Sequence, residues 1–173
     1  RSHTFDRRAD GYARGEACGS ATLRRSLLCG SPPGNQLHGA AVRQDGRSAS
    51  LTAPNGQAQQ GLLAAALADA SAAADELALS EAHGTGTALG DPIEAGSLAG
   101  AVLAKRGEAS EALAVGGVKA NIGHAEPAAG MTGLLKLALG LQGGEAVANA
   151  QLRSLNPHVG SALGGSGHGC AVA

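Results

Sequence analysis

Two histidines follow short apolar stretches and have glycine beside them. His83 lies in EAHGTGTALGDPIEA (81–95), and His124 lies in KANIGHAEPAAG (119–130). The small neighbours allow a ligand to approach both the imidazole ring and the backbone. As neutral imidazoles, two such rings can each donate an N–H to one developing oxyanion, which suits acyl or enolate chemistry. A site of this kind also needs a nucleophile or a base.

Charged and hydroxyl side chains accompany both histidines. Lys119 and Glu126 lie on either side of His124. A nearby cation disfavours the imidazolium and a nearby carboxylate favours it, so together they would set the charge state of this ring. Thr85 and Thr87 alternate with glycines, so their hydroxyls can face a polar ligand.

Each segment also has a purely structural interpretation. In that interpretation His83 packs under a glycine-rich turn, and Lys119 and Glu126 form a surface ion pair. A metal site would need a third ligand of matching reach, and the sequence offers no HxxxH or HxH spacing. Leu89 interrupts a dinucleotide-binding fingerprint, and no GxxxxGK phosphate loop is present. Two histidines on equivalent loops favour a shared site over two unrelated turns.

The segments that must position these residues alternate between strands and helices. LALSEA (77–82) and LAVGGV (113–118) predict short buried strands that end directly before the two loops. We further expect strands at 16–23, 37–44 and the C-terminal end, and helices at 57–70, 91–105 and from Pro127 to about 142. This alternation indicates an α/β fold, in which sites collect at the carboxyl ends of strands.

The second of these helices has a strong start signal. In the run from Asp91 to Glu94, Asp91 is expected to cap the helix and Pro92 to occupy its first position. Glu94 would complete a capping-box-like arrangement with Asp91.

Composition indicates a globular protein and excludes several classes. Hydrophobic residues make up 43% of the chain and charged residues 16%, while Phe5 and Tyr12 are the only aromatic residues. A core of Ala, Leu, Val and Gly needs tight packing or a larger partner, which suggests that the chain is incomplete. Lys+Arg 13 against Asp+Glu 14, with no basic stripe, gives no support for nucleic-acid binding. No apolar stretch approaches the ~18 residues of a membrane span, and the dispersed cysteines fit a reducing compartment.

Several long motifs resemble those of a known family. EAHGTGT…GDPIEA, KANIGHAEPAAG and QDGRSASLTAPNG look like the C-terminal half of a β-ketoacyl synthase, and FDRRADGYARGEACG and GGSGHG agree with it at the two ends. The residues of these motifs most resemble those of the ketosynthase domains of type I polyketide and fatty-acid synthases. The resemblance implies a thiolase-like α-β-α-β-α sandwich that is incomplete here. Residues 1–30 would close its N-terminal half, and residues 31–173 would form its C-terminal half.

The resemblance also implies a decarboxylative Claisen condensation of an acyl thioester with malonyl-acyl carrier protein. His83 and His124 match the family's catalytic histidines, and Lys119 matches its active-site lysine. Thr85 and Thr87 match the threonines that contact the phosphopantetheine arm, and the backbone N–H of Gly165 would complete the oxyanion hole. The domain itself would bind no cofactor.

The family further implies an acyl carrier protein and other synthase domains as partners, a homodimer when full length, and a cytoplasmic location, or a plastid one in an alga.

The sequence departs from the family in its cysteines. The family's nucleophile lies upstream of FDRRADGY, so Cys18, Cys29 and Cys170 match no catalytic position, and we expect the isolated chain to be inactive. Gly165 replaces a gating phenylalanine, and His168-Gly169 replace Thr-Asn. A non-catalytic remnant or scaffold, a decarboxylase-only relative and a thiolase-like enzyme remain as alternatives.

Overall fold

A six-stranded mixed sheet forms the centre of the computed structural model, which describes residues 2–9, 17–26, 34–47, 53–150, 152–164 and 170–172. The strand order is β3-β2-β1-β4-β5-β6. Strand β2 pairs antiparallel with β1 on one side and with β3 on the other, whereas β1, β4, β5 and β6 run parallel to one another. The bounds are β1 Ser2–Ala9, β2 Ala17–Ser26, β3 Gly34–Gln44, β4 Leu77–Glu81, β5 Leu113–Gly116 and β6 Cys170–Val172.

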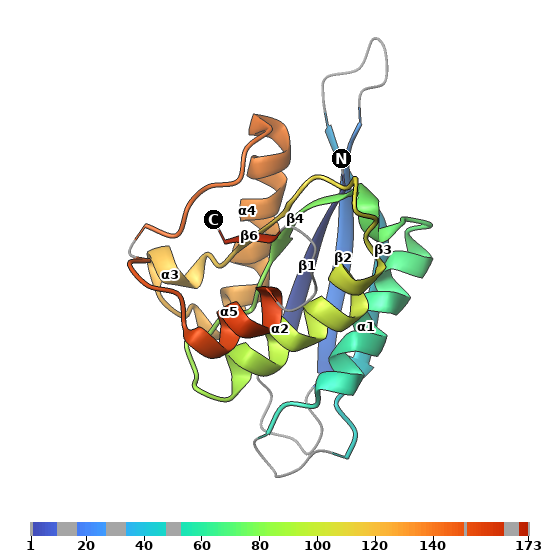
Figure 1. Cartoon of the computed structure of the whole chain (residues 1–173). Coiled ribbons are helices and arrows are strands. Elements are labelled where there is room, and N and C mark those ends of the chain that lie inside the picture. Colours follow the sequence, from blue (N-terminus) through green and yellow to red (C-terminus); the bar gives the residue numbers. More distant parts are fainter. Residues whose placement is uncertain are drawn as a thin grey trace.

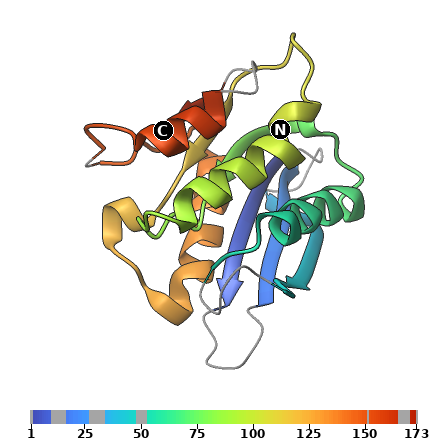
Figure 2. The same cartoon turned by 60° about the horizontal axis from the view of Figure 1, so that its bottom comes forward.

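Helices cover both faces of this sheet (Figure 1). Helices α1 and α2 pack on each other on one face, where α5 adjoins α2, while α4 contacts β1 and β4 on the opposite face. Figure 2 shows the same layers with α4 behind the sheet. The α-helices are α1 Gly56–Asp69, α2 Gly90–Ala101, α3 Lys119–Ile122, α4 Ala129–Gly143 and α5 Pro157–Gly164; the 3₁₀ turns are η1 Ala74–Glu76, η2 Leu103–Lys105 and η3 Glu126–Ala128.

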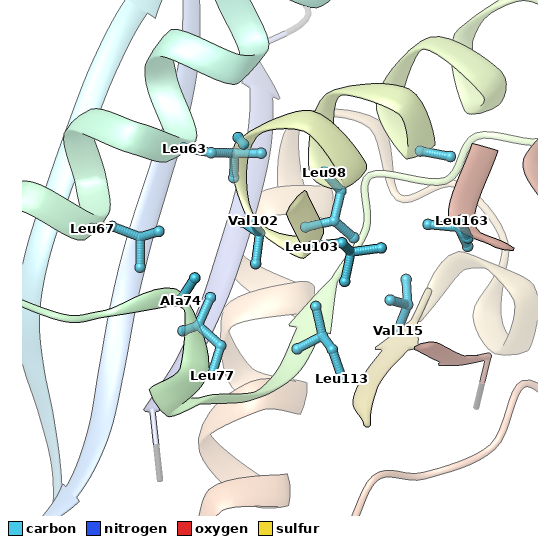
Figure 3. Packing of buried hydrophobic residues seen from close by; sticks show 12 residues of the cluster. Leu63, Leu67, Ala74, Leu77, Leu98, Val102, Leu103, Leu113, Val115 and Leu163 are labelled. Atoms are coloured by element: carbon cyan, nitrogen blue, oxygen red, sulfur yellow. The ribbon is translucent and has the colours of Figure 1, made fainter. Parts of the chain in front are cut away.

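The larger core lies between the sheet and the α1/α2 layer (Figure 3). Leu77, Leu103 and Leu113 are almost completely buried in it. A smaller cluster of Leu79, Leu137 and Leu141 fixes α4 to the other face. Most residues of these two clusters are leucine and alanine, so a chain with almost no aromatic residues forms its core by packing the sheet and the helices closely together.

A buried arginine connects the segments at the starts of β4 and β5, the two strands that precede the histidine-containing loops. The Arg106 guanidinium donates hydrogen bonds to the carbonyls of Ala74, Leu77 and Glu111. It is 4% exposed. The planar fork of an arginine can satisfy several carbonyls at once, which fixes where β4 begins and where the chain enters β5.

Helix α4 leaves an apolar stripe uncovered by the described residues. Met131, Leu135 and Leu139 recur at helical spacing and are 55–67% exposed. This is the kind of face expected of a sandwich that is present only in part, as the sequence suggested.

Most predicted elements are confirmed, with displaced ends. The expected strand at 16–23 is β2, the one at 37–44 is β3, and the helix at 57–70 is α1. Strand β1 was missed because its charged sequence, SHTFDRRA, lacks the apolar alternation of a strand. Helix α5 was also missed because PHVGSALG holds two glycines, and the expected loop after β5 contains the single turn α3.

The predicted cap of α2 is wrong. The helix begins at Gly90, and its N-cap residue is Leu89, whose side chain makes no capping hydrogen bond. The carboxylates of Asp91 and Glu94 instead accept hydrogen bonds from the preceding glycine-rich loop. Tertiary contacts to that loop therefore replace the local capping interaction that the sequence pattern suggested.

Candidate functional site

The two histidine-containing loops meet at one edge of the sheet. His83 follows β4 and His124 follows β5, and these strands are parallel neighbours with Glu81 opposite Gly116. The carboxyl ends of neighbouring parallel strands lie at the same edge, so the fold brings together residues that are far apart in the sequence. The expected convergence of the two loops at the carboxyl ends of β4 and β5 is therefore confirmed.

The two imidazole rings contact each other edge to face. Their centroids lie 5.6 Å apart and their planes are at 87°. His83 is buried, with 9% of its surface exposed, whereas His124 is exposed. One ring is thus fixed inside the protein while the other faces the open side of the site.

A backbone hydrogen bond selects the tautomer of neutral His124. The Glu126 N–H donates to His124 Nδ1 over 3.0 Å. A nitrogen that accepts a hydrogen bond carries no proton, so in the neutral ring Nε2 carries the N–H. His124 is therefore oriented to donate from Nε2 to a ligand oxygen. Glu126 contributes its backbone here, where the sequence had suggested a role for its carboxylate.

His83 is held through its backbone from both sides. Its N–H donates to Glu94 Oε1 over 2.5 Å, and its carbonyl accepts a hydrogen bond from Lys119 Nζ. Gly84 N–H donates to the second Glu94 oxygen over 2.9 Å, in a turn where Gly84 has a φ of 49°. The charges of Glu94 and Lys119 also attract each other. Lys119 thus holds the backbone of His83.

Glu94 was missed as a site residue by sequence reasoning. Burial is the main cause that raises the pKa of its carboxyl, and the two backbone hydrogen bonds and Lys119 oppose this. Burial likewise raises the pKa of Asp91, against hydrogen bonds from the loop and the charge of Lys119. The signal available in the sequence was an acidic pair directly after a glycine-rich loop, which was interpreted as a cap.

The two threonines of the loop have different environments. Thr85 is half-buried and lines the cavity described below. Thr87 is exposed, and its hydroxyl accepts a hydrogen bond from Gly90 N–H over 3.1 Å. Thr87 therefore stabilises the entry to α2 in this structure, whereas Thr85 faces the space next to the histidines.

Two asparagines fasten a distant segment onto the loop after β5. Asn149 Oδ1 accepts from Gly117 N–H over 3.1 Å, and Asn121 Oδ1 accepts from Ala150 N–H over 2.7 Å. Asn121 also donates to the carbonyl of Ala148. Sequence reasoning missed this connection because the partners lie 27 to 32 residues apart.

A cavity of about 590 Å³ opens beside the rings. Its polar lining includes Thr85, Lys119 and His124. Its apolar lining comes from α1, α2, α5, the strands and the loop before α5: Leu63, Ala95, Leu98, Val115, Leu155, Val159, Leu163 and Val172. This volume is within the range of small-molecule sites, and a mostly apolar pocket with a few polar groups is typical of them.

The remaining candidates lie away from this chemistry or outside the described residues. Gly165, Cys29 and His168 fall outside the described residues, so the oxyanion-hole role expected of the Gly165 backbone stays a prediction. Burial raises the pKa of the Cys170 thiol, which disfavours the reactive thiolate. Within the described ranges no three His, Cys, Asp or Glu side chains gather in a way that could hold a metal ion. None of the helices described is both long enough and apolar enough to cross a membrane.

Comparison with known proteins places this geometry in a family. The family model described as the beta-ketoacyl synthase C-terminal domain matches residues 35–153. One phenolphthiocerol/phthiocerol polyketide synthase protein of Mycobacterium tuberculosis is 44% identical over 166 residues, which cover 94% of this chain and 7% of that protein. Another protein of the phenolphthiocerol/phthiocerol polyketide synthase from the same bacterium is 44% identical over 159 residues, which cover 90% of this chain and 8% of that protein.

Solved structures agree with the sequence comparison. The oxazolomycin ketosynthase domain of Streptomyces albus matches with a TM-score of 0.67 and 34% identity over 80% of this chain and 24% of that one. Ketosynthase twelve of the bacillaene polyketide synthase of Bacillus amyloliquefaciens matches with a TM-score of 0.68 and 30% identity over 81% of this chain and 25% of that one. The chain therefore spans a small part of its relatives, and the expected partial thiolase-like fold is confirmed. The chain belongs to the β-ketoacyl synthase family, as a segment of the C-terminal half of a ketosynthase domain of the polyketide synthase type.

Proposed function

We propose that this segment supplies the decarboxylation half-site of a ketosynthase that joins an acyl thioester to a malonyl unit on an acyl carrier protein. His83 and His124 donate N–H groups to the malonyl thioester oxygen, and the nucleophilic cysteine lies outside this chain. The observation that carries the proposal is the contact between the two rings, together with the Glu126 N–H that leaves the proton of neutral His124 on Nε2.

The chemistry follows from where charge develops. When the bond between the malonyl α-carbon and its carboxylate breaks, carbon dioxide leaves and the electron pair moves into an enolate. Two fixed N–H donors stabilise the enolate oxygen in a partly water-excluded site, and each such donor is typically worth about 10²–10³ in rate. The enolate carbon then attacks the acyl-cysteine carbonyl, a carbon–carbon bond forms, and the cysteine thiolate leaves.

The other site residues have supporting roles in this proposal. Lys119 holds the backbone of His83 through the His83 carbonyl and places a positive charge next to that residue. The cavity beside Thr85 accepts the phosphopantetheine arm, which carries the substrate, and Thr87 and the backbone of Gly165 complete the contacts of the arm and the oxyanion. No cofactor is bound by the domain.

The partners in this proposal are an acyl carrier protein and further synthase domains in a cytoplasmic synthase, with a homodimer formed by the complete domain. Related proteins are components of polyketide synthases, which supports a multidomain setting. A fatty-acid pathway would use the same half-site.

The test uses the natural-length polypeptide that carries this chain. Release of carbon dioxide from malonyl-acyl carrier protein and formation of the condensed product are measured for the wild type, His83→Ala, His124→Ala and the control His38→Ala, an exposed histidine on β3. We expect each site variant to lower decarboxylation by about 10²–10³ and the control to retain it. Decarboxylation without condensation would indicate a decarboxylase-only relative, and neither activity would indicate a scaffold or remnant.

A further inference from the structure

A buried ion pair lies directly beneath the site and is not explained by the chemistry above. Lys136 Nζ on α4 lies 2.8 Å from Glu81 Oε2 at the end of β4, and the two side chains are 11% and 1% exposed. Apart from this ion pair, neither atom has a hydrogen-bond partner among the described residues. Each charge therefore depends on the other, because an isolated buried charge is strongly unfavourable.

The second oxygen of Glu81 reaches the other histidine-containing loop. Glu81 Oε1 accepts a hydrogen bond from the N–H of Val118, which is the residue before Lys119. Glu81 is also close in the chain to His83. One carboxylate thus connects the strand that carries His83 with the backbone that leads to Lys119 and His124.

The backbone between the two loops is shaped to admit this pair. A Cβ atom on Gly116 would lie 2.7 Å from Lys136 Nζ and 3.5 Å from Glu81 Oε2. A side chain at this position would force the Lys136 ammonium group to shift away from its place beside Glu81. The close approach shows that the ammonium group belongs to the edge of the sheet where the two loops meet.

We propose that Glu81 is a positioning residue of the ketosynthase reaction and that Lys136 orients and neutralises it. Glu81 fixes the Val118 backbone relative to β4, which sets the separation of the His83 and His124 rings. Lys136 prevents the buried carboxylate from turning away from Val118. This inference rests on the proposed function for its catalytic consequence, but the ring placement that it predicts is independent of activity.

Two double variants of the natural-length polypeptide test the inference. Glu81→Gln with Lys136→Met removes both charges but keeps an acceptor for the Val118 N–H. Glu81→Leu with Lys136→Met removes both charges and the acceptor. Kinetics of malonyl decarboxylation and crystal structures are obtained for both and for the wild type. Both variants lose the same ion pair, so any difference between them reports the contact to Val118.

We expect the Leu/Met variant to lose about 10- to 100-fold in kcat, because small misplacements of catalytic groups have effects of this size. Its KM should change by less than about threefold, since the change affects the transition state more than substrate binding. The Gln/Met variant should stay within about fivefold of the wild-type kcat, and its rings should keep the 5.6 Å centroid separation. In the Leu/Met variant the separation should change by about 1 Å or more.

Equal kcat losses in the two double variants, or unchanged ring separations in both, would overturn the inference. If the wild type lacks activity, the crystal structures still decide: displaced rings in the Leu/Met variant alone would support the positioning role while the proposed function fails. If that variant does not fold, Gly116→Ala replaces it. This substitution should displace Lys136 and lower kcat, whereas Gly96→Ala, whose Cβ meets no atom within 4 Å, should not. An unaffected Gly116→Ala protein would also contradict the inference.

Discussion

The hold of Glu94 on the His83 loop gives the sharpest test of the site geometry. Its two oxygens accept the N–H groups of His83 and Gly84 at 2.5 and 2.9 Å. Glu94→Ala leaves both donors without this acceptor. A buried donor left unsatisfied costs about 1–3 kcal/mol. Gly84 is half-buried and gains access to water, so we expect a local loss of about 2–3 kcal/mol.

Hydrogen–deuterium exchange measures this loss locally, even in a large synthase. A loss of about 2–3 kcal/mol corresponds to roughly 30- to 150-fold faster exchange of the His83 and Gly84 amides. Glu94→Gln keeps one acceptor oxygen and should show about half of the effect in free energy. Glu108→Ala, an exposed acidic residue elsewhere, serves as the matched control and should leave these amides unchanged. Exchange in Glu94→Ala within twofold of the wild type would refute the reasoning.

The raised pKa of Glu94 gives the same residue a distinct pH dependence. Its ordinary value is 4.5, and burial raises it in the folded protein. Between the ordinary pKa and the raised pKa of the folded protein, the folded state binds more protons than the unfolded state. The contribution of Glu94 to stability is therefore greatest at low pH and is lost as pH rises. The wild type should therefore lose stability relative to Glu94→Gln as pH increases through this window, as measured by urea midpoints. A gain with rising pH would mean that hydrogen bonds and Lys119 outweigh burial.

Three further predictions concern the supports of the site. Arg106→Met leaves three carbonyls without their donor and should lower the free energy of unfolding by about 3–5 kcal/mol in urea titrations, with Arg106→Lys intermediate; equal stability of all three proteins would contradict the role of the guanidinium fork. Gly39→Ala places a Cβ 2.4 Å from the backbone nitrogen of Ala70, so thermal unfolding should show a loss of about 1–3 kcal/mol, and an unchanged Tm would count against this packing. Asn149→Ala removes the acceptor of the Gly117 N–H and should cost about 1 kcal/mol and speed exchange there, whereas Asn149→Asp keeps the acceptor and should not; similar exchange in the two variants would argue against this contact.

Much of the architecture, and the two histidine-containing loops of the candidate site, could be inferred from local sequence. Short apolar runs before glycine-rich loops predicted β4 and β5, and Ala/Leu-rich segments predicted α1 and α4. These elements could be predicted because the pattern of apolar residues within each segment indicates how it is buried. The two loops carrying His83 and His124 were recognisable for the same reason, since residue type and order survive without any knowledge of contacts. Strand β1 was not recognisable, because its charged sequence acquires its strand conformation from pairing with β2 and β4.

Only the tertiary structure decided how the site is held. The sequence suggested Asp91 and Glu94 as helix caps, yet the fold turns both carboxylates toward the loop that carries His83. It suggested a carboxylate role for Glu126, yet the backbone N–H of this residue selects the tautomer of His124. The sequence shows a single charged residue in each of two apolar segments, Glu81 and Lys136. That the two form an ion pair is evident only once β4 and α4 pack against each other. Hydrogen bonds and ion pairs between distant segments have no local signature, because their free energy depends on distances that exist only after the sheet and helices have packed.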